Sequence, residues 1–372
     1  VYKLKLNFLK FHIFFFLSLS LMVSYGKSSE FESNQLEQVI ENAVDLVIVP
    51  NHLVFKSKAK DIHDKIRLLC DRPTKENFID VRISFKDLVI AFSKIEMYRF
   101  GPSIKENNYE RLFFWPDRRS RGLKQVQKIL NSEDPSALKP ESLYNKSVAV
   151  QGILALEYIL FGKGSEVLEN ELTNFRCEYG KAVAHSIRRV ANELYQDWSG
   201  SNNFGSRFKN PGPGNYYYRS HLESIVELLK SSKEIIHILR DQKILTSITN
   251  DDEKKPNPKT VPFWRSELLI VALISNLDSV IELIKISGIS STLSDENSYI
   301  SAQLIQELET VKSVLSSSDF LGREWLIIIK EEQAVEKLKY IMAPLTGAIQ
   351  LLSEEYPLAL NISLGFNSRD GD

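Results

Sequence analysis

The sequence has little cysteine, no excess of either charge, and few segments in which apolar and polar residues alternate. Two of its 372 residues are cysteines and they form no CxxC pair, which excludes a zinc ribbon and a thioredoxin-type site. Lysine and arginine number 47 against 48 aspartates and glutamates. The basic excess typical of nucleic-acid binders is therefore missing, and no nucleic-acid partner is expected. Strand-like alternation with hairpin turns is scarce, which favours an all-α chain.

The composition is otherwise that of a globular protein. Apolar residues make up 43% and aromatic residues 10% of the chain, close to the averages for folded domains. A disordered or collagen-like chain is excluded. At roughly 150 residues per domain, the length favours two domains over one.

Residues 1–26 have the pattern of a signal peptide. Three lysines and no acid precede the apolar run Phe14–Val23, and small residues follow it up to Gly26. The run is shorter than the ~20 residues that a transmembrane helix needs. We expect export to the periplasm and no stable membrane span after cleavage; an uncleaved anchor is the alternative. No cysteine follows the run, which excludes a lipoprotein anchor.

The rest of the chain predicts long helices on both sides of one linker. Apolar residues recur at helical spacing, and Gly and Pro mark the ends of the segments. The clearest linker is GSNNFGSRFKNPGPG, residues 200–214. The expected helices cover residues 34–69 (bent near Pro50), 74–100, 143–161, 168–198, 217–246, 262–287, 296–316 and 325–355.

This pattern predicts an all-α fold of two up-and-down four-helix bundles. The N-terminal bundle is expected at 30–199, with an inserted loop at 99–130, and the C-terminal bundle at 215–372. The even split is compatible with an internal duplication, although no sequence period proves one.

The two cysteines are expected to form a disulfide. Cys70 closes the first helical region and Cys177 lies early in the fourth helix, so both belong to the same predicted bundle. Lone thiols of an exported protein commonly pair. Two buried free thiols are the alternative.

The loop 99–130 is the least ordinary segment, because long insertions are more often functional than decorative. One interpretation is a surface that binds an anion or a partner. The other is that the aromatic residues cap a bundle end while the arginines pair with carboxylates. The residues concerned are Arg99, Arg111, Arg118, Arg119 and Arg121, interleaved with Phe113, Phe114 and Trp115.

Several separated motifs resemble the imelysin-like family, which includes insulin-cleaving membrane peptidases and periplasmic iron-regulated proteins. In chain order they are RFGP, FFWPD, QVQKIL, VAVQGILALEYILFG, FRCEY and LGFNSRDGD, and the similarity spans about residues 35 to 372. The resemblance implies an exported protein of two helical bundles with a site in the crease between them. It also implies a link to iron acquisition and a peptidase activity for some members.

The signature of that family is Gly-x-His-x-x-Glu, in which His and Glu share one helix face and can bind a metal ion together. Here the stretch keeps Gly152 and Glu157 but has Leu154 where the family has histidine. Leucine has no lone pair to donate, so iron or zinc would find Glu157 alone as a ligand. The resemblance therefore carries neither the metal site nor the peptidase activity securely.

No other catalytic constellation is visible. The sequence has no HExxH, no GxSxG and no P-loop. His237 has Glu234 and Asp241 at helical spacing, but these residues belong to a polar stripe that a solvated helix face explains. His52 and His63 lie near acids in the first helix, and the same explanation applies.

Glu157 is the unusual residue of an apolar segment. From Val148 to Phe161 the only other strongly polar groups are Gln151 and the hydroxyl of Tyr158. Burying an unpaired carboxylate costs several kcal/mol, so it must reach solvent, a cation or hydrogen-bond donors. Either it faces the crease and helps to hold a ligand, or it pairs with an arginine such as Arg99 or one from 111–121.

These observations predict an exported, non-catalytic binding or accessory protein in iron, haem or other metal uptake. One alternative is a metal-dependent peptidase with non-standard ligands, and the other is an interaction scaffold that binds a cell-envelope protein. The candidate ligand-binding residues are Arg99, Trp115, Arg118, Gly152 and Glu157, with Glu157 also the candidate metal ligand.

Overall fold

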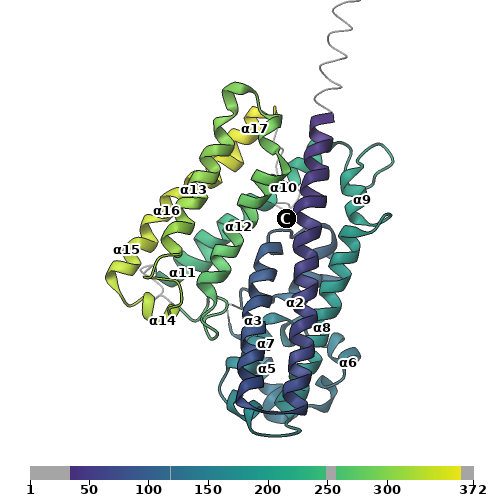
Figure 1. Ribbon diagram of the computed structural model, residues 1–372, viewed down its shortest axis with the longest axis vertical. Coiled ribbons are helices and arrows are strands. Elements are labelled where there is room, and N and C mark those ends of the chain that lie inside the picture. The colour runs from purple at the N-terminus through teal and green to yellow at the C-terminus, as the bar shows by residue number, and fades with distance from the viewer. Residues whose placement is uncertain (1–33, 118, 249–256, 362–372) are drawn as a thin grey trace, which may run out of the picture.

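The computed structural model describes residues 34–117, 119–248 and 257–361, and these contain helices and no strand (Figure 1). The expected all-α fold is confirmed. The expected signal peptide and Arg118 lie outside the described residues. Within the described ranges, no helix is both long enough and apolar enough to cross a membrane.

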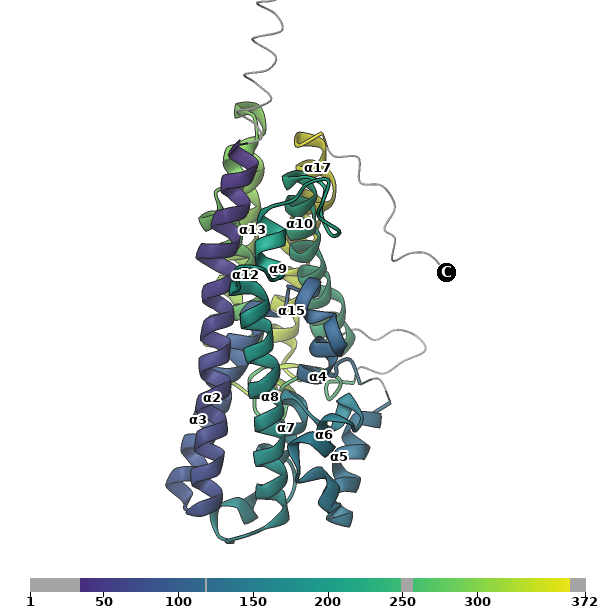
Figure 2. The same cartoon turned by 90° about the vertical axis from the view of Figure 1, so that its right-hand side faces the viewer.

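Three long helices form the frame of the N-terminal half. The first runs from residue 34 through a π-helical segment, η1 (Ala43–Ile48), into α2 (Val49–Asp71). α3 (Lys75–Ile95) packs along one side of α2, and α8 (Phe175–Ser199) packs along another (Figure 2). Each helix turns an apolar face inward, as their helical periodicity predicts.

The expected helix 143–161 is wrong in its first half. The structure has α6 (Pro140–Tyr144), a 3-10 turn, and then α7 (Ile153–Phe161). Gly152 causes the break, because its φ is +85° and a Cβ there would lie 2.3 Å from the carbonyl oxygen of Arg111. Only glycine allows both this conformation and this approach of two backbones. Two other short helices of this region are α4 (Asn108–Leu112) and α5 (Arg121–Ser132).

The C-terminal half is also helical, and its last expected helix is interrupted. α10 (His221–His237) continues as the π-helical η7 (Ile238–Leu245). The expected helix 262–287 begins only at residue 269, and the expected helix 325–355 is divided by turns. The remaining bounds are α11 (Thr246–Ile248), α12 (Leu269–Ser287), α13 (Tyr299–Leu315), α14 (Trp325–Ile328), α15 (Glu332–Tyr340), α16 (Met342–Gln350), η10 (Leu351–Glu355) and α17 (Tyr356–Ala359).

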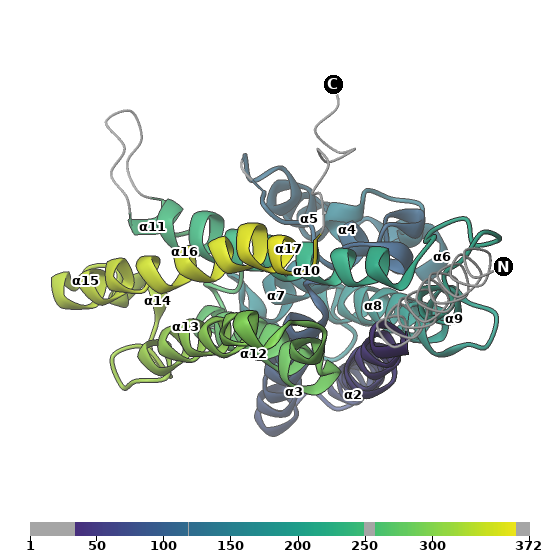
Figure 3. The same ribbon diagram turned by 90° about the horizontal axis from the view of Figure 1, so that it is seen from above.

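The expected linker 200–214 is packed against the protein. It contains α9 (Phe204–Lys209), and Phe204 and Phe208 pack on Trp198 with ring centroids 5.1 and 5.7 Å away. The two halves also share an apolar core, because α12 lies along α3 (Figure 3). The division into two four-helix bundles at this segment stays a prediction.

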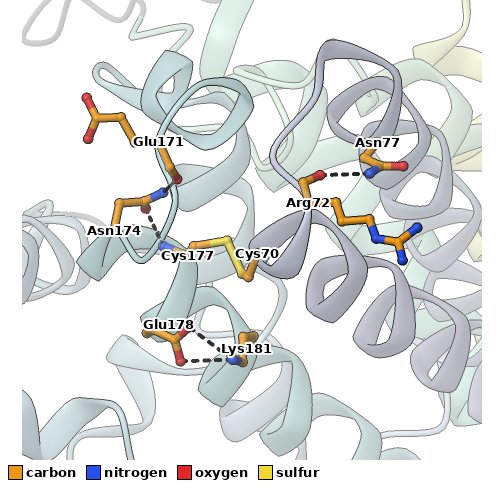
Figure 4. The surroundings of a disulfide bond; sticks show 8 residues. All are labelled: Cys70, Arg72, Asn77, Glu171, Asn174, Cys177, Glu178 and Lys181. Atoms are coloured by element: carbon orange, nitrogen blue, oxygen red, sulfur yellow. Dashed lines mark hydrogen bonds and ion pairs between the residues drawn. A yellow bond between two sulfur atoms is a disulfide. The ribbon is translucent and has the colours of Figure 1, made fainter.

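The Cys70–Cys177 disulfide is confirmed. Cys70 lies at the end of α2 and Cys177 in the first turn of α8, with 5.6 Å between their Cα atoms (Figure 4). Asn174 caps α8, because its side-chain oxygen accepts a hydrogen bond from the backbone N–H of Cys177 at 2.8 Å. The bond therefore joins two helices that already pack side by side.

Candidate functional site

The segment that resembles the family signature lines a small cavity. The cavity holds about 130 Å³ and lies between α7, the start of α5 and the segment 257–265 that precedes α12. The aromatic and apolar side chains in its walls include Phe114, Trp115, Leu154, Tyr158 and Trp264. Its charged side chains are Asp117, Glu157, Lys259 and Arg265.

Glu157 is buried, with 1% of its surface exposed, and it is hydrogen-bonded. Its Oε1 accepts from the backbone N–H and the hydroxyl of Ser266 at 3.0 and 2.8 Å. Its Oε2 lies 4.0 Å from a guanidinium nitrogen of Arg265. Burial raises the pKa of Glu157, and Arg265 and the Ser266 donors offset part of that rise.

The cation beside Glu157 therefore comes from the other half of the chain. Arg99, one of the expected partners, instead contacts Glu96 at 3.1 Å. Among the described arginines of 111–121, which exclude Arg118, none forms an ion pair with Glu157. The reason is topological: the segment before α12 folds over α7 and brings Arg265 to it. Arg265 is held in place by Trp264 and Tyr158, whose ring centroids lie 4.2 and 5.5 Å from its guanidinium carbon.

Trp115 joins the inserted loop 99–130 to the segment 257–265 by a hydrogen bond. Its indole N–H donates to the backbone carbonyl of Thr260 at 2.8 Å. Asp117, two residues later, accepts from the backbone N–H groups of Arg121 and Leu123 at 2.7 and 3.1 Å and so fixes the start of α5. These bonds set the shape of one cavity wall.

Behind Trp115 lies a buried ion pair between the two halves. The ammonium of Lys243, in η7, donates to Glu96 at 2.7 Å and to Asn276 at 2.9 Å. It also lies 6.0 Å from the ring centroid of Trp115. Both charged side chains have 0% exposure. Short π-helical segments such as η7 often occur at functional sites.

The residues of the cavity do not fit a bound iron or zinc ion. Leu154, on the turn of α7 before Glu157, supplies no donor atom. The two carboxylates, Asp117 and Glu157, are already occupied by N–H and O–H donors, and Arg265 and Lys259 add positive charge. Across the described ranges no group of three or more His, Cys, Asp or Glu side chains is arranged to hold a metal ion.

The structure brings together some of the expected site residues and separates others. Trp115 and Glu157 line the same cavity, and Gly152 positions the helix that carries Glu157. Arg99 lines a different and larger cavity, of about 1110 Å³. Arg118 lies outside the described residues.

Sequence reasoning missed Arg265 and Ser266. The region 262–287 has the pattern of one helix, but α12 starts at residue 269 because Phe263 and Glu267 adopt positive φ values of 61°. Nothing local in the sequence signals this irregular segment. The isolated carboxylate of Glu157 was the one sign that a cation and donors had to be nearby.

Comparisons with known proteins agree with the resemblance. The family model of Imelysin (Peptidase_M75) matches residues 48–348. An imelysin-like protein from Psychrobacter arcticum 273-4 has the same fold at 15% identity and a TM-score of 0.72, covering 90% of this chain and 98% of that one. A second similar structure is described as that of an iron-regulated protein A precursor from Parabacteroides distasonis ATCC 8503. It has 14% identity and a TM-score of 0.72, covering 87% of this chain and 95% of that one. No curated protein sequence matches the chain. Because the family model spans most of its length, the chain belongs to the imelysin family.

Proposed function

We propose that this protein is an exported, non-catalytic binding or accessory protein in iron uptake, and that its ligand occupies the cavity beside Glu157. The proposal rests on the groups that bind the carboxylate of Glu157. Its carboxylate is bound by Ser266 and Arg265 in a cavity where the neighbouring Leu154 supplies no donor atom for a metal ion. The connection to iron comes from the similar structure that is described as iron-regulated.

The lining suits a ligand with negatively charged oxygen atoms of its own, which can accept from the cationic side chains or bind iron. The half-buried Arg265 and the exposed Lys259 offer positive charge beside aromatic side chains. A carboxylate such as citrate, alone or chelating iron, meets these demands better than a bare cation does. A second hollow of about 240 Å³ lies on the other side of the same two residues, Trp264 and Arg265.

Calorimetric titration of the mature protein tests this proposal. We expect citrate or ferric citrate to bind, whereas free Zn²⁺ and Fe²⁺ do not. Arg265→Gln should weaken the binding by about tenfold or more, because a charge-assisted hydrogen bond is lost. Arg67→Gln, an exposed change on α2, is the matched control and should have no effect. Equal binding to wild type and Arg265→Gln would contradict the proposal.

The alternatives predict other outcomes. A metal-dependent peptidase would hydrolyse a peptide substrate when zinc is added, and Glu157→Gln would abolish that hydrolysis. An interaction scaffold would bind none of the small molecules and would bind a cell-envelope protein through the loop 99–130. Either result would replace the proposed function.

A further inference from the structure

A large cavity of the described structure lies away from Glu157 and has two kinds of wall. It holds about 1110 Å³ between residues 99–105, the end of α8 with α9, and the outward face of α10. One wall is aromatic and apolar and includes Phe204 and Tyr217. The other carries side chains of the polar stripe on α10, which by its sequence pattern would be an ordinary solvated face.

The cationic side chains outnumber the acids in this cavity. Five lysines and arginines line it against three carboxylates. Lys105 is paired with Asp197 at 3.1 Å. Lys230 and Lys233 are half-buried on α10, one turn apart, and form no ion pair with any other residue of the described ranges. The cavity therefore has positive charge available for a ligand.

Arg99 is held in a fixed orientation in this cavity. Its Nε and Nη2 donate to the backbone oxygen and the carboxylate of Glu96, at 3.4 and 3.1 Å. Its guanidinium carbon lies 4.3 Å from the ring centroid of Tyr109. These contacts leave the Nη1 donors free within the described structure. A guanidinium that is already ordered loses little conformational entropy when it binds an oxyanion.

The aromatic wall is also built in advance. The ring of Phe204 lies directly on the backbone of Gly101, where an added Cβ would come within 2.4 Å of it. Tyr217 packs edge-on against Phe204, with centroids 5.4 Å apart, and Arg207 lies 5.9 Å from the ring of Tyr217. This wall offers the half-exposed ring of Tyr217, at 49% exposure, standing against the buried ring of Phe204 with the cation of Arg207 beside it.

We propose that this cavity binds an organic anion with an aromatic body. The carboxylate or other oxyanion is bound by Arg99, Lys230 and Lys233, and the ring packs on Phe204 and Tyr217. Concave sites that combine apolar walls with a few convergent polar groups are typical of small-molecule binding. This site is independent of the cavity beside Glu157.

Calorimetric titration with 1-naphthoate is the test. Two further probes each retain one of its features: 1-naphthylmethanol has the aromatic body without the charge, and inorganic phosphate has the negative charge without the aromatic body. We expect naphthoate to bind at least about tenfold more tightly than either of them, since a charge-assisted contact contributes that much. Equal affinity for the neutral alcohol would overturn the role of the cations. Equal affinity for phosphate would overturn the role of the aromatic wall, and no binding of naphthoate would overturn the proposal.

Variants locate the site. The double change Lys230→Gln/Lys233→Gln should weaken naphthoate binding by about tenfold or more, and Tyr217→Ser should weaken it through the other wall. The matched control is Lys86→Gln/Lys128→Gln, two exposed changes outside the cavity, which should leave binding unchanged. Unchanged binding in both cavity variants would overturn the location. Arg265→Gln, which tests the other cavity, should leave naphthoate binding intact.

Discussion

The buried pair Glu96–Lys243 gives the sharpest prediction about stability. It joins the end of α3 to η7, and neither side chain reaches solvent. Burial disfavours the charge on Glu96, but Lys243 and Arg99 outweigh it and hold the pKa of Glu96 below its usual value. Burial lowers the pKa of Lys243, and Glu96 counteracts it. The carboxylate of Glu96 and the ammonium of Lys243 therefore each favour the charged form of the other.

Replacing one residue of the Glu96–Lys243 pair should lower the free energy of unfolding more than replacing both. Breaking a buried pair typically costs about 3–5 kcal/mol, because the remaining charge is left uncompensated. In Lys243→Met the carboxylate of Glu96 still has Arg99 at 3.1 Å and the Asn276 amide at 3.0 Å. We therefore expect Lys243→Met to lower the free energy of unfolding by about 3 kcal/mol, near the lower limit of that range.

Removing the carboxylate instead of the ammonium should lower the free energy of unfolding further. In Glu96→Ala the ammonium of Lys243 retains only the neutral oxygen of Asn276, and we expect a loss of about 4–5 kcal/mol. The double variant Glu96→Ala/Lys243→Met leaves no buried charge in the pair. It should therefore lose less than the sum of the two single changes.

Urea denaturation followed by circular dichroism measures these losses as shifts of the midpoint at constant slope. The control is Lys339→Met, which removes an exposed lysine paired with Glu336 and should change little. A loss below about 1 kcal/mol for Lys243→Met, or strict additivity in the double variant, would refute the reasoning.

Three further predictions concern the disulfide and α7. Replacing Cys70 and Cys177 by serine opens a loop of 107 residues and should lower the free energy of unfolding by roughly 5 kcal/mol at most; denaturation curves measure this, and a loss under about 1 kcal/mol would contradict it. Because burial raises the pKa of Glu157, its ionisation removes stability as pH rises from the unfolded pKa through the folded one. Glu157→Gln keeps an acceptor for Ser266 and should flatten that part of the stability–pH curve, whereas an unchanged curve would contradict the shift. Leu154→His should gain no measurable affinity for zinc or iron in a calorimetric titration, since the carboxylate of Glu157 is already engaged; tight binding would show that the site accepts a metal after all.

The sequence by itself determined the features that depend on local chemistry. Helical periodicity and scarce strand patterns predicted the all-α fold. The helix expected from residue 74 begins there as α3, because the hydroxyl of Thr74 accepts from the N–H of Asn77 at 3.2 Å, a bond that spans only three residues. The helix expected to end at residue 161 does end there, since Phe161 is the last residue of α7. The disulfide also followed from the sequence, because lone thiols of an expected exported protein commonly pair and the chain has only two cysteines.

Only the tertiary structure decided which distant groups meet. The break before α7 depends on the carbonyl of Arg111, which approaches Gly152 from another segment. Glu157 and Ser266 are 109 residues apart, and Glu96 and Lys243 are 147 apart. Burial demanded a partner for each of these carboxylates, but charge alone does not say which one. The partner was selected by the way the segment before α12 and the π-helical η7 pack against the N-terminal half.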